Sequence, residues 1–218
     1  MKPAETTDQV LVAAASELAQ GIDALGLDLD ARRQSTLIQY LVLLEKWNRV
    51  YNLTAVRDLK KMVFSHLLDS LAVLPHLPGG RVLDVGSGAG LPGIPIAVAR
   101  PDLEVVLLDS NHKKAAFLRQ AVADLALSNA NVVCERVQSW QRPKGFDVII
   151  SRAYAEIGEF VMHSRHLLAP DGVFVAMKGL HPYEEIERLP KDYRLHEVIE
   201  LSVPGLEAAR RLILVKPQ

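Results

Sequence analysis

Residues 82–93, with the sequence VLDVGSGAGLPG, decide the fold of this chain. A short apolar run, expected to be a strand, leads into three glycines at alternate positions, Gly86, Gly88 and Gly90, and an apolar helical stretch follows. Glycine lets the backbone turn sharply and approach a ligand closely, and the helix that opens there directs free N–H groups at it. Ligands bind at the carboxyl ends of the strands in an open α/β sheet. The loop therefore predicts an α/β fold with a ligand site at this turn.

Short apolar runs alternate with helical stretches after this loop. We predict helices near residues 93–99, 111–127 and 155–168, and seven strands at 81–85, 104–109, 132–136, 146–151, 173–178, 194–201 and 210–216. Such alternation indicates a mostly parallel sheet that is covered on both faces. The link between the last two strands contains Val203-Pro204-Gly205-Leu206 and is too short for a comfortable parallel crossover. These two strands are therefore expected to form an antiparallel pair at one edge.

The first 75 or so residues have helical periodicity instead. One expected helix places on a single face the residues Leu37, Tyr40, Leu41, Leu44 and Trp47. A second helix is expected from about Asp58, which would be its N-cap, and Pro75 and residues 78–80 end the helical part. We therefore expect a helical extension over residues 1–78 and an α/β core over residues 79–218.

Composition and charge narrow the class of protein. The chain has 218 residues, of which 49% are hydrophobic, and it has no run of 18 apolar residues. We expect no membrane span and no signal peptide, and a cytoplasmic protein whose only cysteine, Cys134, cannot form an internal disulfide. The net charge of −1 argues against a nucleic-acid partner, but residues 31–61 carry a net charge of +5. These residues form either a local basic surface or solvated helix faces.

Two carboxylates favour a cationic nucleoside cofactor. Gly88, Gly90 and Gly93 match the dinucleotide pattern GxGxxG, but Gly88 comes two residues too late after the strand. Asp84 would also repel a pyrophosphate, whereas S-adenosylmethionine carries an ammonium and a sulfonium and no phosphate. Asp109 ends the second expected strand, where a carboxylate accepts hydrogen bonds from ribose hydroxyls; alternatively it caps the next helix.

Several further motifs carry a resemblance to a known family. They are WNxxYNLT at 47–54, HxxDS at 66–70, GSGAGLPGIP at 86–95, LLDS at 107–110, ISRA at 150–153 and LLAPDG at 167–172. With the glycine loop, they resemble the class I S-adenosylmethionine-dependent methyltransferases, and within them the bacterial 16S rRNA (guanine-N7) methyltransferases, the RsmG or GidB family. The resemblance covers nearly the whole chain from about residue 30. It implies a Rossmann-like, seven-stranded sheet, S-adenosylmethionine as cofactor, and a guanine of the 530 loop as the methylated base.

The resemblance also implies site residues. Together with the loop and the two acids, the expected cofactor-binding residues are Asp84, Gly86, Ser87, Gly88, Gly90, Leu91, Asp109, Val137, Gln138 and Arg152. Gln138 stands where glutamate is more usual in the family. Arg152, at the carboxyl end of the fourth strand, is also the expected catalytic residue, because its planar guanidinium suits the cofactor carboxylate or guanine O6. A structural ion pair is the alternative.

The residues argue against two other methylations. An exocyclic amine acceptor often uses an Asn/Asp-Pro-Pro-aromatic turn after the fourth strand, and residues 151–154 contain no proline. A pyrimidine C5 acceptor requires a cysteine nucleophile, and Cys134 is expected to be buried and inert within the third strand. Guanine N7 has a free lone pair and needs no general base, so orientation is the main requirement, contributing up to roughly 7–11 kcal/mol.

The expected RNA contacts lie on several elements and are Arg57, Lys113, Lys114, Tyr154, Arg165, Lys178, Arg211 and Lys216. Tyr154 would stack on the flipped base, although a core tyrosine is the equal alternative. The expected partner is 16S rRNA or the small ribosomal subunit, with a monomeric enzyme and no metal; His66 and Asp69 share a helix face where they can pair. An NAD-dependent oxidoreductase and a non-catalytic ribosome-binding protein remain the alternative functions.

Overall fold

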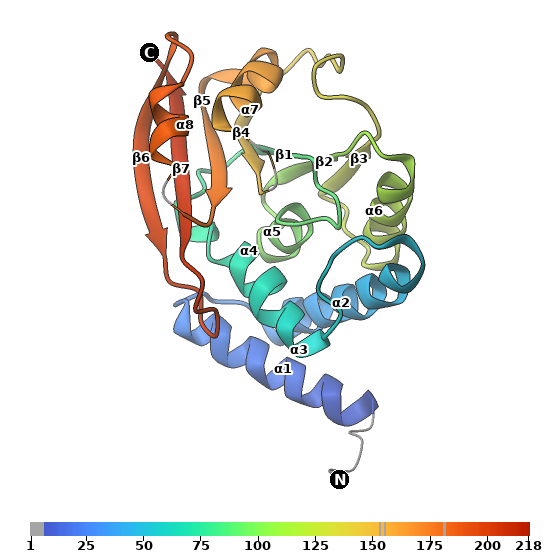
Figure 1. The fold of residues 1–218 in the computed structure, drawn as a ribbon. Coiled ribbons are helices and arrows are strands. Elements are labelled where there is room, and N and C mark those ends of the chain that lie inside the picture. The colour runs from blue at the N-terminus through green and yellow to red at the C-terminus, as the bar shows by residue number, and fades with distance from the viewer. Residues whose placement is uncertain (1–6, 153, 155, 181) are drawn as a thin grey trace.

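The computed structural model describes residues 7–152, 154, 156–180 and 182–218. A seven-stranded sheet with the order β3-β2-β1-β4-β5-β7-β6 forms its centre (Figure 1). The strands are β1 (Arg81–Val85), β2 (Glu104–Leu108), β3 (Ala130–Val133), β4 (Phe146–Ser151), β5 (Leu168–Lys178), β6 (Tyr193–Leu201) and β7 (Arg210–Pro217). The first five are parallel, and β7 lies antiparallel between β5 and β6. The predicted fold class is confirmed, including the antiparallel pair at one edge.

Helices cover both faces of the sheet. Those before β1 are α1 (Thr7–Ala24), α2 (Ala31–Tyr51), α3 (Leu59–Met62), the π-helical segment η1 (Val63–Leu68), α4 (Asp69–Leu71) and the 3-10 turn η2 (Leu74–His76). Those that follow are α5 (Gly93–Ala99), α6 (His112–Asp124), α7 (Ile157–Ser164), the 3-10 turn η3 (Arg165–Leu167) and α8 (Tyr183–Glu187). None of the helices in the described part of the chain is long and apolar enough to cross a membrane.

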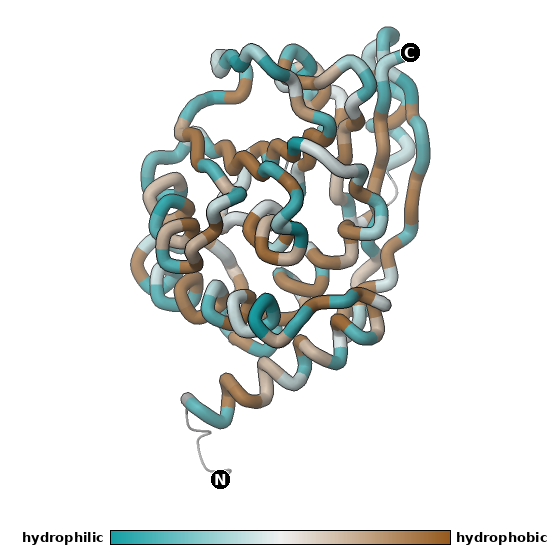
Figure 2. The backbone as a smooth tube through the Cα atoms, turned by 180° about the vertical axis from the view of Figure 1, so that it is seen from behind, coloured by the Kyte–Doolittle hydropathy of each residue, from teal (hydrophilic) through white to brown (hydrophobic). Residues whose placement is uncertain are grey.

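Alternation along the strands divides the core into two layers. Val82 and Val148 point to the face that the N-terminal helices, α5 and α6 cover, whereas Leu83 and Ile149 point to the face that α7 covers. In Figure 2, hydrophobic residues run along these central strands. The continuous apolar runs of the sequence thus serve a sheet that is buried on both sides.

The N-terminal helices share their core with the sheet. Leu37, Leu41 and Leu44 of α2 belong to the same buried cluster as Val82 of β1, and Trp47 packs edge-on against Phe117 of α6 at 5.7 Å. α1 lies outermost and packs on α2, α3 and η1 (Figure 1). One hydrophobic cluster therefore spans the position at which we divide the extension from the core.

Two local predictions need correction. β3 ends at Val133, because its parallel partner β2 ends at Leu108, so Cys134 lies beyond the strand. Cys134 is only half-buried, with Sγ 3.3 Å from Nδ1 of His112, and the prediction of a buried cysteine within the strand is wrong.

Asp58 caps its helix as predicted, accepting a hydrogen bond from the Lys61 N–H, but that helix widens into a π-helix at Val63.

Replacing Leu41 by alanine tests the shared core. Leu41 is fully buried between α2 and the sheet, so Leu41→Ala should lower the free energy of unfolding by about 2–5 kcal/mol. Val50 is 70% exposed on the same helix, and Val50→Ala should change the free energy of unfolding by less than about 0.5 kcal/mol. Urea unfolding followed by fluorescence and by circular dichroism should give one transition in each variant; separate transitions for helices and sheet would contradict a common core.

Candidate active site

The glycine loop between β1 and α5 requires glycine for two different reasons. Gly86, Gly88 and Gly90 all have positive φ angles, between 58° and 89°. A Cβ on Gly90 would lie 2.4 Å from Ile94 Cδ1, so this residue allows α5 to pack closely. A Cβ on Gly86 would meet no atom within 4 Å, because Gly86 faces a cavity.

Side chains from the end of β2 and from α2 fix this loop. Oδ2 of Asp109 accepts a hydrogen bond from the Gly88 N–H at 2.9 Å, and its Oδ1 accepts one from the Asn111 N–H at 2.8 Å. The hydroxyl of Tyr40, in α2, donates to the Ala89 carbonyl at 2.6 Å. The helical periodicity correctly placed Tyr40 on a buried helix face, but it did not predict this hydrogen bond. The only hint was that a tyrosine, which has a polar hydroxyl, stands among leucines on that face.

Asp84 is a fully buried acid below the loop. Its Oδ2 accepts a hydrogen bond from the Gly93 N–H at 3.0 Å, whereas its Oδ1 has no hydrogen-bond partner among the described residues. Desolvation raises the pKa of Asp84 to about 7, against the lowering effects of the Gly93 N–H, Ser87 and the positive charge of Arg152. A cation next to this carboxylate would remove the cost of burying its charge.

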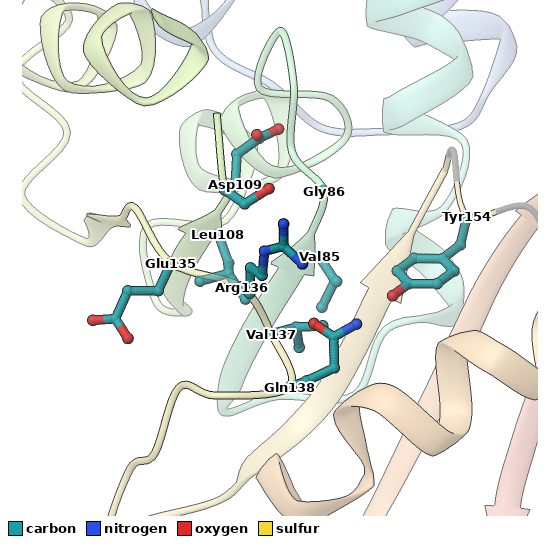
Figure 3. Close-up of a pocket in the computed structure, with 10 residues that line it drawn as sticks. Val85, Gly86, Leu108, Asp109, Glu135, Arg136, Val137, Gln138 and Tyr154 are labelled. Carbon is teal, nitrogen blue, oxygen red and sulfur yellow. The ribbon is translucent and has the colours of Figure 1, made fainter. Parts of the chain in front are cut away.

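A cavity of about 220 Å³ opens at the carboxyl ends of β1 and β2. Its lining residues are Val85, Gly86, Leu108, Asp109, Ser110, Glu135, Arg136, Val137, Gln138 and Tyr154. In Figure 3, Asp109 and Gly86 lie on one side, Val137 and Gln138 on another, and Tyr154 stands across from them. We call this the loop cavity.

The loop cavity brings together Gly86, Asp109, Val137 and Gln138, four of the residues expected to bind the cofactor. Ser87, Gly88, Gly90 and Leu91 form the loop behind it, and Asp84 lies beneath. Val85, Leu108, Ser110, Glu135 and Arg136 are additional lining residues. Val85 lies in the glycine-loop segment and Leu108 and Ser110 lie in the LLDS motif, whereas no motif marked Glu135 or Arg136.

A second cavity, of about 390 Å³, lies between the N-terminal helices and the ends of β4 and β5. Its lining residues are Val56, Ser65, His66, Asp69, Arg152, Met177, Lys178, Gly179 and Arg210. We call this the arginine cavity, because two guanidinium groups line it. Lys178 links the two cavities: its Nζ donates to the Tyr154 carbonyl at 3.4 Å and to Glu185 at 2.8 Å.

Arg152 lies in the arginine cavity and does not line the loop cavity. Its Nη1 donates to the Ser65 carbonyl at 3.2 Å and lies 3.5 Å from Oδ2 of Asp69. Asp69 is 2% exposed, and its Oδ1 accepts a 2.8 Å hydrogen bond from Nε of Arg210. The ion pair that was the alternative interpretation of Arg152 is therefore present.

His66 and Asp69 do not pair with each other, although they share a helix face; each instead has a structural contact of its own. The imidazole Nε2 lies 2.9 Å from the Thr54 hydroxyl, because the loop after α2 folds back over η1, and Asp69 is engaged by the two arginines. Burial, with a contribution from the Arg152 charge, lowers the pKa of His66 to about 4, so this ring is neutral at pH 7.

The residues expected to bind RNA do not form one surface. Lys113 and Lys114 begin α6 beside the glycine loop, and Arg211 pairs in register with Lys178 at the rim of the arginine cavity. Arg165 precedes β5 and Lys216 lies near the end of antiparallel β7, so both lie at the other end of these strands from Lys178 and Arg211. Arg57 is exposed and bonds Asn52 at 3.0 Å. Tyr154 is half-buried, and its hydroxyl lies 2.8 Å from Nδ1 of His163.

Comparison with known proteins gives the family. Residues 33–214 match the family model described as rRNA small subunit methyltransferase G. The chain belongs to this family. The ribosomal RNA small subunit methyltransferase G of Laribacter hongkongensis is 55% identical over 197 residues, which cover 90% of this chain and 95% of that protein. The resemblance inferred from the sequence motifs is confirmed.

Solved structures support the methyltransferase fold. The glycopeptide N-methyltransferase MtfA superposes with a TM-score of 0.58 at 13% identity, over 71% of this chain and 96% of that one. TrmN from Thermus thermophilus gives a TM-score of 0.52 at 22% identity, over 68% of this chain and 48% of that one. At these identities the similarity concerns the fold alone.

The buried carboxyl of Asp84 predicts a pH dependence of stability. An unfolded aspartic acid loses its proton near pH 4 and the folded one near pH 7, so its contribution to stability falls as the pH rises between these values. Relative to Asp84→Asn, the wild-type free energy of unfolding should fall by about 1.4 kcal/mol per pH unit in this window and level off above it. Urea unfolding of both proteins from pH 4 to 9 measures the difference; parallel curves would contradict the burial effect.

Proposed function

We propose that this methyltransferase transfers the methyl group of S-adenosylmethionine to N7 of a guanine in the 530 loop of 16S rRNA. The observation that carries the cofactor assignment is the pair of carboxylates at the glycine loop. Asp84 has an oxygen without a partner among the described residues and suits a cationic group, whereas a dinucleotide would bring a pyrophosphate to the same place. The negative charge of Asp84, with the family membership, favours methyl transfer over an NAD-dependent oxidoreductase and over a ribosome-binding protein without catalysis.

The loop cavity fits the nucleoside part of the cofactor. Asp109 uses one lone pair of each oxygen for backbone N–H groups, which leaves acceptor capacity for two ribose hydroxyls. Gly86 leaves room for close approach, and Val137 and Gln138 form the wall that an adenine would contact. When bound, S-adenosylmethionine supplies a methyl group activated by a positively charged sulfur.

The arginine cavity fits an acceptor that needs no general base. Guanine N7 carries a free lone pair at neutral pH, so the protein must orient the base and exclude water. Arg152, held by Ser65 and Asp69, has a fixed guanidinium that can donate to guanine O6 beside N7. His66, which lines the same cavity, is neutral and hydrogen-bonded with Thr54.

The RNA partner would contact the rim of the two cavities. Lys113, Lys114, Lys178 and Arg211 lie on the cavity side and are the phosphate contacts we propose, together with Arg57. Naked 16S rRNA and the small ribosomal subunit are both possible substrates, and each places the enzyme in the cytoplasm. We also propose a monomer that consists of a helical extension over residues 1–78 and an α/β core over residues 79–218.

Gly86 and Gly26 form a matched pair for testing the cofactor site. Both have positive φ angles, of 72° and 66°, and a Cβ would meet no atom at either position, but only Gly86 lines the loop cavity. Gly86→Ala and Gly26→Ala should each cost about 1–2 kcal/mol of stability through backbone strain. Calorimetry should show at least tenfold weaker S-adenosylhomocysteine binding for Gly86→Ala only; equal affinities would place the cofactor elsewhere.

Methyl transfer to ribosomal RNA tests the function itself. The enzyme should label small subunits from a strain that lacks it, using radioactive S-adenosylmethionine, with the label in 7-methylguanosine of the 530 loop by nucleoside mass spectrometry. Arg152→Ala should lower kcat/KM about 10- to 100-fold, the effect of one hydrogen bond from a charged donor. Arg100→Ala, which removes an exposed pair with Asp102, should not change it.

Each failure of this experiment has a separate meaning. Label in another nucleoside would overturn the guanine assignment and keep the methyltransferase. An unchanged rate in Arg152→Ala would remove this residue from the proposed catalytic role. No label, with stabilisation by NAD but not by S-adenosylhomocysteine in thermal unfolding, would favour the oxidoreductase.

A further inference from the structure

In the function proposed so far, the aspartate of the HxxDS motif at residues 66–70 only helps to hold Arg152, yet its carboxylate also lines the arginine cavity. Asp69 is 2% exposed and follows directly on the π-helical segment η1. π-helical turns are rare and occur frequently at functional sites. A buried carboxylate in a cavity that has room for a small molecule is a candidate for ligand recognition.

The hydrogen-bonding groups around Asp69 form a defined pattern. Arg210 bonds one oxygen at 2.8 Å, and Arg152 lies 3.5 Å from the other. An ionised carboxylate offers about four acceptor positions, so acceptor capacity remains on both oxygens. The cavity wall therefore presents one buried acceptor flanked by two guanidinium donors.

This pattern is complementary to guanine. The base has acceptors at O6 and N7 and donors at N1–H and the N2 amine, whereas adenine has an acceptor at N1 and a donor at N6. A carboxylate accepts from the guanine donors, and a guanidinium donates to O6. Adenine would set its N1 lone pair against the carboxylate and its amine against the arginines, so both of its contacts would be repulsive.

The position of the cavity agrees with methyl transfer at N7. Ser151 donates to the Val85 carbonyl at 2.8 Å, which joins the end of β4 to the end of β1, where the loop cavity opens. Arg152 lines one cavity and Tyr154 lines the other, two residues further on. A base in the arginine cavity with N7 toward the loop cavity points its N1 and N2 edge away from the cofactor side.

We propose that Asp69 reads the N1–H and N2 amine of the target guanine in the arginine cavity and so sets the base specificity of the enzyme. The inference rests on the proposed function and adds to it the residue that distinguishes guanine from other bases. Arg210 fixes the Asp69 carboxylate, and Arg152 donates to O6.

Inosine tests this assignment, because it keeps N7, O6 and N1–H and lacks only the N2 amine. Small subunits are reconstituted with 16S rRNA that carries guanosine or inosine at the target position. For the wild type, kcat/KM should fall about 10- to 100-fold on inosine, the effect of one hydrogen bond to a charged acceptor. In Asp69→Asn, activity on guanosine should fall and the two substrates should differ by no more than about threefold.

Three controls make the result specific. Asp69→Glu keeps a carboxylate and should retain the preference for guanosine at a lower rate. Asp102→Asn, which changes an exposed carboxylate paired with Arg100, should keep the wild-type preference. S-adenosylhomocysteine affinity, measured by calorimetry, should stay within about twofold in every variant, because Asp69 does not line the loop cavity.

The outcomes separate this inference from the proposed function. Equal wild-type rates on guanosine and inosine would overturn the role of Asp69 and leave the methylation intact. If the preference for guanosine over inosine persisted unchanged in Asp69→Asn, or was lost in Asp69→Glu, a group other than the Asp69 carboxylate would recognise the N2 amine. Absence of methylation of the guanosine particle by the wild type would overturn the proposed function instead.

Discussion

The left-handed glycine loop after β1 is the constraint on which the site depends. Such a loop has few side-chain contacts of its own, so its shape is set by the groups that bond its backbone. Asp109 holds the Gly88 N–H, Asp84 holds the Gly93 N–H, and Tyr40 bonds the Ala89 carbonyl. These anchors come from the residue after β2, from β1 and from α2, so the N-terminal helices contribute to the loop as directly as the sheet does.

The charges around the end of β4 are divided between two cavities. At the glycine loop, Asp84 is fully buried and Asp109 is 7% exposed, with Arg136 also lining the loop cavity; in the arginine cavity, Arg152 and Arg210 flank Asp69. A cationic cofactor and an acceptor with exposed carbonyl and ring-nitrogen lone pairs match these two environments respectively. In the proposed function, this arrangement would orient the two reactants without requiring a group that takes up a proton.

The sequence predicted the sheet well because its signals are local. Mostly apolar runs such as residues 146–151 indicate strands that are buried on both faces of a sheet. The glycines at 86, 88 and 90 indicate a turn whose backbone angles few other residues adopt. The arginine cavity was not predictable in this way, since Asp69 and Arg210 are 141 residues apart and meet only because β7 returns antiparallel beside β5. The end of β3, and with it the exposure of Cys134, depends on the length of β2 rather than on its own residues.

Backbone hydrogen exchange with and without S-adenosylhomocysteine tests most directly whether the anchored loop is the cofactor site. If it is, saturating ligand should slow exchange in segments 86–91 and 135–138, which border the loop cavity, and leave η1 unchanged. Unchanged exchange in both segments, with protection confined to the walls of the arginine cavity, would contradict it.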